Sequence, residues 1–313
     1  IEQIRTRVLP KRGIVAAPDE ILITLGSQNA LYLLTRLLLS STTRIGVENP
    51  CFREAINTFL LADAEVVPHP VDEEGIVLNE RPCDYYYVTP GHQVPTGVTM
   101  SSARRRQLLE HAARHDAVII EDDYDSESNF TLNPLPALKA SDRSGRVVYV
   151  SSLSKALSPG LRLGFMVADP DLIDEARALR RLVYRHPPTN IQYQMAHFLA
   201  QGHYETHLRR YHYDSAQRWE RLHAALQRYL PSCRALAGSE HANAFWLQTP
   251  AQINTQQLTW RAAHAGVLIE PGARHFLSAA PPDNYFRMGF HAINPDAIAQ
   301  GVEVLRGQLE QMG

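Results

Sequence analysis

Apolar residues recur along this chain with two different spacings. Short apolar runs are typical of buried strands, and they alternate with segments whose apolar residues recur every three or four positions, as in an amphipathic helix. The predicted strands of the first half lie at residues 19–26, 44–50, 65–71, 85–89, 117–120, 146–150 and 163–168. Strands that alternate with helices in this way predict an α/β fold.

The pattern changes in the second half of the chain. A long helical region extends over residues 172–228, with a break at Pro187 and Pro188. Shorter strands follow, with helices between them, at residues 244–248, 267–270 and 285–290. We therefore predict a large domain at residues 1–205, and a connecting helix with a small C-terminal α+β domain at residues 206–313.

Composition limits the classes of function. The net charge of −2 gives no electrostatic reason for these residues to bind nucleic acid. No apolar run approaches the length of about 18 residues that a membrane span needs. Cys51, Cys83 and Cys233 lack the spacing of metal ligands, which predicts no metal site and reduced thiols in a cytoplasmic protein. Residues 1–9 have the pattern of an amphipathic helix without a cap, so we expect the chain to begin within a longer protein.

One stretch, residues 151–164, concentrates candidate chemistry. It follows an apolar strand, so Lys155 comes to the carboxyl end of a sheet, where open α/β sheets bind ligands. A single lysine after a strand is most often a solvated surface residue. Here Ser152 and Arg162 add anion-binding groups beside the amine. An amine near cationic or apolar groups can lose its proton and form a Schiff base with a carbonyl, and Lys155 is the candidate for this role.

Other strand ends carry groups that fit the same site. The small-residue turn at Gly26 leads into a predicted helix, whose N-terminus either binds a phosphate or is simply capped by Ser27. Phe52 follows the next strand and is either a core residue or a ring at the mouth of a site. Residues 90–97 form a rigid Pro/Gly loop that includes His92, and such loops at strand ends often shape a site.

Residues 121–127 hold five acidic side chains directly after an apolar strand. They form either an exposed acidic turn or a cluster that meets positive partners, because unpaired buried carboxylates are costly. Together with the other strand ends, they describe a pocket for a phosphorylated aromatic aldehyde. Lys155 would form the imine, Asp122 would pair with a pyridinium nitrogen and Tyr124 would donate to the ring oxygen. An aromatic side chain would stack on the ring, and the phosphate would be held by Ser152, Arg162 and the Gly26–Gln28 amides.

The chain resembles the fold-type I pyridoxal-phosphate aminotransferases, and within them the aminotransferase-like domain of MocR/GabR-type transcription regulators of the GntR superfamily. The resemblance lies in segments 25–31, 47–52, 89–97 and 121–127, and in 151–155 with Arg162. It implies a large domain with a mixed, mostly parallel, seven-stranded sheet between helices, and a small C-terminal α+β domain. It also implies pyridoxal 5'-phosphate as the cofactor.

The resemblance also implies roles for single residues. Lys155, Asp122 and Tyr124 would be catalytic. The residues implied to bind the cofactor are Ser27, Gln28, Phe52, His92, Asp122, Tyr124, Ser152, Lys155 and Arg162. Arg287 would bind the carboxylate of a substrate or effector. Without the resemblance, Arg287 could equally be a surface arginine on an edge strand. Phe52 stands where the family often has tyrosine, so a hydroxyl that could reach the phosphate is missing.

Two functions fit these residues. In the first, the chain is the effector domain of a MocR-type regulator, in which a small amino compound with a carboxylate binds through Lys155 and shifts a homodimer between conformations. DNA would then be contacted only by an N-terminal domain that this chain lacks. In the second, the chain is a free-standing aminotransferase that acts on an amino acid and a 2-oxo acid. A cofactor-free scaffold is a third interpretation, against which the complete set of residues argues.

Overall fold

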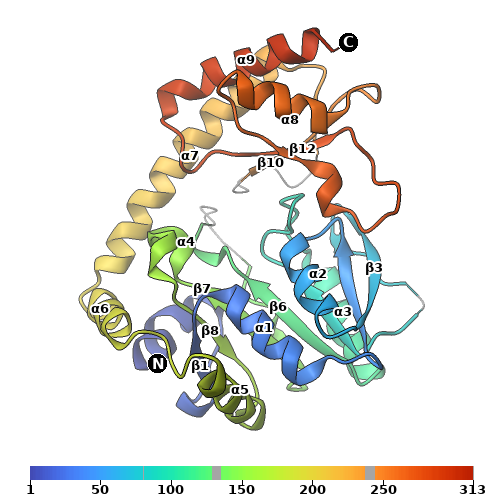
Figure 1. Cartoon of the computed structure of the whole chain (residues 1–313). Helices are drawn as coiled ribbons and strands as arrows, with labels where there is room; N and C mark the ends of the chain where they lie inside the picture. The colour runs from blue at the N-terminus through green and yellow to red at the C-terminus, as the bar shows by residue number, and fades with distance from the viewer. Residues whose placement is uncertain (80, 129–134, 237–243, 313) are drawn as a thin grey trace.

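The computed structural model describes residues 1–79, 81–128, 135–236 and 244–312, which form two β-sheets linked by a long helix (Figure 1). The strands of the larger sheet are β1 (Ile21–Thr24), β2 (Arg44–Asn49), β3 (Glu65–Asp72), β4 (Gly75–Ile76), β5 (Tyr85–Val88), β6 (Val118–Asp123), β7 (Val147–Ser152) and β8 (Gly164–Val167). Their order across the sheet is β1-β8-β7-β6-β5-β2-β3-β4. The predicted α/β fold is therefore confirmed.

The larger sheet is mixed, as the resemblance implies. Strands β3, β2, β5, β6 and β7 run parallel, whereas β8 is antiparallel to both β7 and β1. All seven predicted strands are present. The prediction missed an eighth, the two-residue β4, which pairs antiparallel with the end of β3. The chain can reverse there because Gly75 adopts a φ of 109°, which other residues rarely reach.

Helices cover both faces of this sheet, which explains why its central strands are apolar along their length. They are α1 (Ser27–Leu38), α2 (Arg53–Leu60), α3 (Ser102–Arg114), α4 (Ser154–Leu157), α5 (Pro170–Val183) and α6 (Thr189–Ala200). Helices α1, α2 and α5 pack on one face, with Leu31 and Phe59 fully buried there. Helices α3 and α6 pack on the other face.

The smaller sheet lies at the far end of α7 (His203–Tyr229), above the larger sheet in Figure 1. Its strands are β9 (Arg234–Ala235), β10 (Ala244–Gln248), β11 (Glu270–Pro271) and β12 (Tyr285–Gly289), in the order β11-β12-β10-β9. Helices α8 (Thr255–His264) and α9 (Ile298–Glu310) and the last part of α7 share one apolar core with it.

Two expectations for this half of the chain need correction. The strand predicted at residues 267–270 is wrong except for Glu270. Leu268 is 84% exposed after the turn at Gly266 (φ 86°), so the chain joins the sheet only at β11. The predicted break at the Pro187-Pro188 pair is confirmed, but the helical region breaks a second time at Gly202, which has a φ of 75°.

Residues 1–12 form an N-terminal helical segment against the larger sheet. A π-helical turn at Ile4–Val8 continues into a 3-10 helix at Leu9–Arg12. The buried side chains of Ile4, Val8 and Leu9 join the core beneath β8 and α6, as the amphipathic pattern predicts. The segment is thus anchored by apolar packing rather than by a cap.

Some features are absent from the ranges that the structure describes. No helix within these ranges has the length and hydropathy of a membrane span. No three His, Cys, Asp or Glu side chains gather within the same ranges as metal ligands would. The three cysteines, all of them described, are free thiols.

Candidate active site

A cavity of about 280 Å³ lies between the carboxyl edge of the larger sheet and the smaller sheet. It is lined by Ser27, Gln28, Phe52, Tyr87, Val94, Asp122, Tyr124, Lys155, Glu270, His275 and Arg287. Seven of the ten site residues predicted from the sequence are in this set. The other three, His92, Ser152 and Arg162, do not line the cavity.

Asp122 stands at the end of β6 and is almost fully buried, with 3% of its surface exposed. Its Oδ2 accepts a hydrogen bond of 2.9 Å from the Tyr87 hydroxyl, while its Oδ1 accepts none from the residues that the structure describes. Burial raises the pKa of Asp122 to about 7, and the Tyr87 hydroxyl acts in the opposite direction. A cationic donor placed at Oδ1 would offset the cost of burying the ionised carboxylate of Asp122.

Lys155 lies in the short helix α4, directly after β7. Its Nζ is 2.9 Å from Oδ1 of Asp125 and 4.1 Å from the centre of the Tyr124 ring. The side chain keeps 34% of its surface exposed, and because Lys155 lines the cavity, that surface faces a recess rather than open solvent. Burial lowers the pKa of the amine, while the charge of Asp125 raises it. Lys155 is therefore an amine with a weakened hold on its proton, as an imine-forming lysine needs.

His92 lies beside this amine but outside the cavity wall. Its Nδ1 is 3.3 Å from Oδ2 of Asp125, the same carboxylate that holds Lys155. The Tyr124 hydroxyl donates to the backbone oxygen of His92 over 3.3 Å. The structure thus gives His92 contacts with Asp125 and Tyr124, and the cofactor contact that the resemblance implies for it stays a prediction.

The turn before α1 forms another part of the wall. Gly26 adopts a φ of 85°, and Ser27 is the first residue of α1 rather than its side-chain cap, so the capping alternative for Ser27 is wrong. Arg162 packs against this turn, and its Nη2 donates to the backbone oxygen of Leu25 over 2.9 Å. The Ser152 hydroxyl accepts from the Ser154 amide over 3.3 Å. These groups lie close to a helix N-terminus, which attracts anions.

Phe52 precedes α2 and is half-buried at the cavity. A buried network behind it fixes the loop at residues 90–97. Gln93 donates to the backbone oxygen of Pro50 over 2.7 Å, and the Thr89 hydroxyl donates to Glu48 over 2.7 Å. Burial raises the pKa of Glu48 to about 7. The prediction that this rigid loop shapes a site agrees with the position of Val94 on the cavity wall.

The acidic run at residues 121–127 is not an exposed turn. Glu121 accepts hydrogen bonds from the backbone amides of Leu138 and Lys139. Asp123 is 2.7 Å from Nε of Arg12 and accepts a hydrogen bond of 2.7 Å from the Tyr149 hydroxyl. The alternative in which these acids meet partners is the one that the structure supports, and Arg12 ties the N-terminal helical segment to β6.

Arg287 comes from β12 of the smaller sheet, and its Nη1 is 3.3 Å from Oε2 of Glu270. Contact with His275, and then the nearby arginines, lowers the pKa of Glu270 to about 2. Glu270, His275, Tyr87 and the role of Asp125 were not predicted from the sequence. For Asp125 a signal existed, since the acids of its run were expected to meet cations. For Glu270 and His275 the available signal was the Pro271-Gly272 turn between them.

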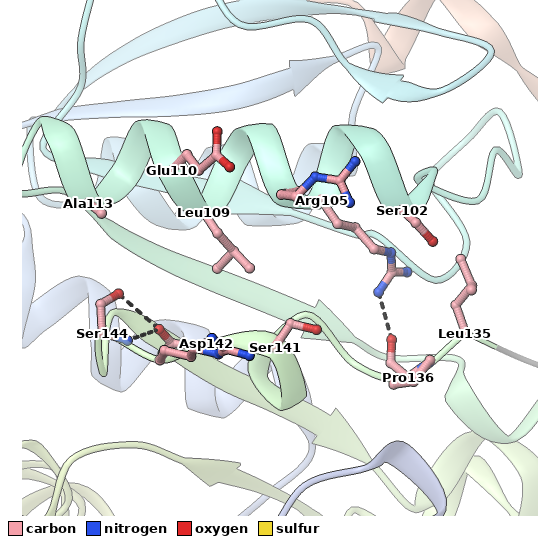
Figure 2. A pocket seen from close by; sticks show the side chains of 12 residues that line it. Ser102, Arg105, Leu109, Glu110, Ala113, Leu135, Pro136, Ser141, Asp142 and Ser144 are labelled. Atoms are coloured by element: carbon pink, nitrogen blue, oxygen red, sulfur yellow. Dashed lines mark hydrogen bonds between the residues drawn. The ribbon is translucent and has the colours of Figure 1, made fainter.

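A second and larger cavity, of about 620 Å³, lies between α3 and residues 135–144 (Figure 2). Its buried arginine, Arg105, donates to the backbone oxygens of Met100, Pro136 and Pro90. Figure 2 shows the bond to Pro136 at the cavity wall. None of the predicted site residues lines this cavity. The guanidinium of its buried arginine, Arg105, is already taken up by backbone oxygens. The smaller cavity is therefore the candidate site.

An open α/β sheet, a smaller sheet above its carboxyl edge, and an amine with a buried carboxylate in the cavity between them define the class of fold-type I pyridoxal-phosphate-dependent transferases. The chain belongs to the family described as aminotransferase class I and II, whose sequence model matches residues 3–305. The family expected from the sequence is thus confirmed.

Relatives include both regulators and enzymes. The chain is 38% identical to the HTH-type transcriptional regulator TauR of Rhodobacter capsulatus, over 96% of this chain and 63% of the relative. It is 34% identical to the probable rhizopine catabolism regulatory protein MocR of Rhizobium meliloti, over 94% of this chain and 60% of the relative. It is 30% identical to the 2-aminoadipate transaminase of Thermus thermophilus, over 95% of this chain and 78% of the relative. The chain thus spans less than two thirds of these regulators.

Solved structures agree with this family. The kynurenine aminotransferase of Pyrococcus horikoshii superposes with a TM-score of 0.91 at 27% identity, over 99% of this chain and 79% of that one. The α-aminoadipate aminotransferase LysN of Thermus thermophilus also superposes with a TM-score of 0.91. Its identity is 28%, over 100% of this chain and 82% of that one. The LysN structure holds a phosphopyridoxyl-leucine adduct. The family and this adduct indicate pyridoxal phosphate as the cofactor.

Proposed function

We propose that this chain is a pyridoxal-phosphate-binding, aminotransferase-like domain that senses an amino compound as the effector domain of a MocR-type transcription regulator. The observation that carries the proposal is the similarity to two proteins named as regulators over nearly the whole chain. A separate N-terminal domain of the longer protein would contact DNA, and these residues would not. The protein would act in the cytoplasm as a homodimer.

The residues around the cavity fit the cofactor. The buried Oδ1 of Asp122, which lacks a partner among the described residues, suits a protonated pyridine nitrogen. We assign Phe52 to the face of the ring and Tyr124 to the ring oxygen. The groups assigned to the phosphate are Ser27, Gln28, Ser152 and Arg162. When bound, pyridoxal phosphate supplies an aldehyde that bonds to amines and a ring that withdraws electrons.

Lys155 is the amine that we assign to the covalent bond with the cofactor and to proton movement at its Nζ. Burial lowers its pKa and so favours the neutral, nucleophilic amine, although Asp125 acts against this. Asp125 holds Nζ at 2.9 Å, and His92 contacts Asp125 in turn, which supports a positioning role for His92. Arg287 is assigned to the far end of the amino compound, for which the sequence predicts a carboxylate.

Absorption spectroscopy tests the assignment of Lys155. The protein loaded with pyridoxal phosphate should show a visible band that Lys155→Ala abolishes. Lys11→Ala is the matched control, because Lys11 is an exposed lysine in a surface ion pair with Glu205. A visible band that survives in Lys155→Ala would show that another amine holds the cofactor.

A free-standing aminotransferase is the second candidate function. It is favoured by the similarity to the 2-aminoadipate transaminase, 78% of which this chain covers. Incubation with amino acids and 2-oxo acids separates the two functions. A spectral shift without turnover supports the sensor. Multiple turnovers, with a new amino acid accumulating beyond the protein concentration, would support the enzyme and contradict the sensor.

Exposed apolar side chains near the α5–α6 connection support the proposed homodimer. Leu182 is 85% exposed and Tyr193 is 66% exposed. Apolar side chains that gather at a surface often mark a protein–protein interface. Light scattering on the purified chain should give twice the monomer mass, and Leu182→Asp should lower that mass towards the monomer. A protein that remains monomeric at high concentration would contradict this part of the proposal.

A further inference from the structure

Two histidines of α7 donate hydrogen bonds to the backbone beside the cavity. The Nε2 of His207 is 2.6 Å from the backbone oxygen of Ala156, which directly follows Lys155. The Nε2 of His212 is 2.7 Å from the backbone oxygen of Glu127, in the acidic run after β6. Because a backbone oxygen only accepts hydrogen bonds, each Nε2 must carry the hydrogen that it donates. A single helix thus holds two segments that meet at the cavity.

These two segments carry the amine and the carboxylate that face each other. Lys155 belongs to α4, and its Nζ is 2.9 Å from Oδ1 of Asp125. Asp125 directly precedes the 3-10 turn at Ser126–Ser128, which packs against both α4 and α7. In Figure 1, α4 lies beside α7. A shift of either segment along α7 would therefore change the distance between Nζ and the carboxylate.

Apolar packing makes this part of α7 a fixed support. Tyr204 and Leu208 are buried in the apolar core beneath β8. Leu153 and Ala156, on either side of Lys155, belong to the same core. Close-packed side chains of this kind resist displacement. The helix therefore cannot move away from α4 without opening this core.

The smaller sheet also contacts α7 through His291, which lies just after β12. Its Nδ1 is 3.2 Å from the Tyr211 hydroxyl and 3.1 Å from the Ser215 hydroxyl. The ring of Tyr211 stacks on His291, with 5.4 Å between ring centres, and on His207, with 6.4 Å. Residues 207, 211 and 215 are four apart, so they follow one another along one face of the helix. His207 thus stands in a row of side chains that reaches from α4 to the smaller sheet.

The position of Asp125 matters for the chemistry of the amine. Burial lowers the pKa of Lys155, whereas the charge of Asp125 raises it. Arg287 on β12 also lowers this pKa, and Asp122 on β6 raises it. Among these charged groups, Asp125 has the largest effect and makes the direct contact with Nζ. A longer distance from Nζ to Asp125 would therefore leave the amine with a lower pKa.

We propose that His207 and His212 are positioning residues, which set the contact between Lys155 and Asp125 by fixing the backbone next to each of them. Neither histidine lines the cavity, so both act through the segments that they hold. This inference rests on the proposed function, because it takes Lys155 as the amine of the site. It extends the site to a helix that the sequence did not connect with it.

Labelling of the cofactor-free protein with acetic anhydride tests the proposal. Only a neutral amine is acetylated, so the yield at Lys155, measured by mass spectrometry over a range of pH, gives the midpoint of its titration. His207→Leu and His212→Leu should each lower this midpoint by about one pH unit, because Asp125 is no longer held at contact distance. Asp125→Asn removes the charge itself and should lower the midpoint at least as much.

His207→Gln and His212→Gln are the conservative variants. The amide nitrogen of glutamine can take the place of the histidine Nε2 and donate the same hydrogen bond without any charge. Each should bring the midpoint back towards that of the parent. His203→Leu is the matched control, because His203 is an exposed histidine of the same helix, and it should leave the midpoint unchanged.

Other results would overturn the inference. They are an unchanged or raised midpoint in the leucine variants, a midpoint that stays low in the glutamine variants, or an equal decrease in His203→Leu. If the leucine variants do not fold, His207→Asn and His212→Asn decide. The shorter amide keeps a polar side chain but does not reach the backbone oxygen, so these variants should lower the midpoint in the same way.

Failure of the proposed function is seen separately, as the lack of a visible band that depends on Lys155 in the protein loaded with pyridoxal phosphate. The labelling needs no cofactor, so it decides the inference in either case. When the band is present and the midpoint does not move, the inference alone is wrong.

Discussion

Asp122 is expected to make the cofactor-free protein less stable as the pH rises. Burial raises its pKa from 3.8 to about 7, so between these values the folded protein holds a proton that the unfolded chain releases. The stabilising contribution is complete below a pH of about 3.8 and is lost as the pH approaches 7. Over about three pH units, at about 1.4 kcal/mol each, the loss amounts to about 4 kcal/mol.

Asp122→Asn removes this dependence because the amide cannot ionise. The Asn oxygen can still accept the Tyr87 hydrogen bond, but its NH₂ group stands where Oδ1 lacks a partner among the described residues. A buried donor without a partner costs about 1–3 kcal/mol at every pH. The variant should therefore be about 1–3 kcal/mol less stable than the parent at pH 4 and about 1–3 kcal/mol more stable at pH 8.

Urea unfolding of the two cofactor-free proteins at pH 4, 6 and 8 measures this difference. Comparing variant with parent cancels the contribution of Glu121, whose pKa burial also raises to about 7. The pKa of Glu48 is also raised to about 7, mainly by burial, but the charge of Asp122 contributes to this rise, so that part stays in the difference. Asp19→Asn, at an exposed position, is the control and should show a flat difference. If the difference in free energy of unfolding between Asp122→Asn and the parent is also the same at pH 4 and pH 8, burial does not raise the pKa of Asp122.

Three further substitutions probe other contacts. Tyr87→Phe removes the hydroxyl that donates to Asp122 and should weaken cofactor binding about tenfold in absorption titrations; unchanged affinity would mean that this bond does not tune the carboxylate. Arg12→Ala removes the buried cation beside Asp123 and should lower the free energy of unfolding, measured with urea, by about 3–5 kcal/mol. Adding Asp123→Asn to Arg12→Ala should restore part of this loss, and no restoration would count against the ion pair. Gly164→Ala would put a Cβ 2.7 Å from the backbone of Gly26, and a melting temperature equal to the parent's would contradict this close approach.

Local patterns predicted the elements that local forces determine. The helix predicted to follow the turn at Gly26 is α1, because its apolar face and the glycine before it are both visible in the sequence. The apolar runs that became β2, β5, β6 and β7 were also evident, since strands buried on both faces are apolar throughout. Two-residue strands such as β4 and β11 are too short to leave a pattern.

The candidate site could be predicted in type but not in its pairings. The sequence brought Lys155 and Asp122 to one edge of a sheet, because parallel strands end there together. It could not show that Lys155 pairs with Asp125, since the direction of a side chain after a strand depends on the turn. Nor could it show the partnership of Glu270 with Arg287, which depends on the register between β11 and β12.

The position of β1 at the edge of the larger sheet has a consequence for how the molecule assembles during synthesis. β1 pairs with β8, where Ile21 lies opposite Val167, so the first strand of this sheet to be translated waits for the last strand of the sheet. Pairings between such distant segments are slow to form, and an apolar strand that waits is a target for chaperones. The turn at Gly26, which follows β1, is therefore among the last parts of the cavity to be built, although it is among the first to be translated.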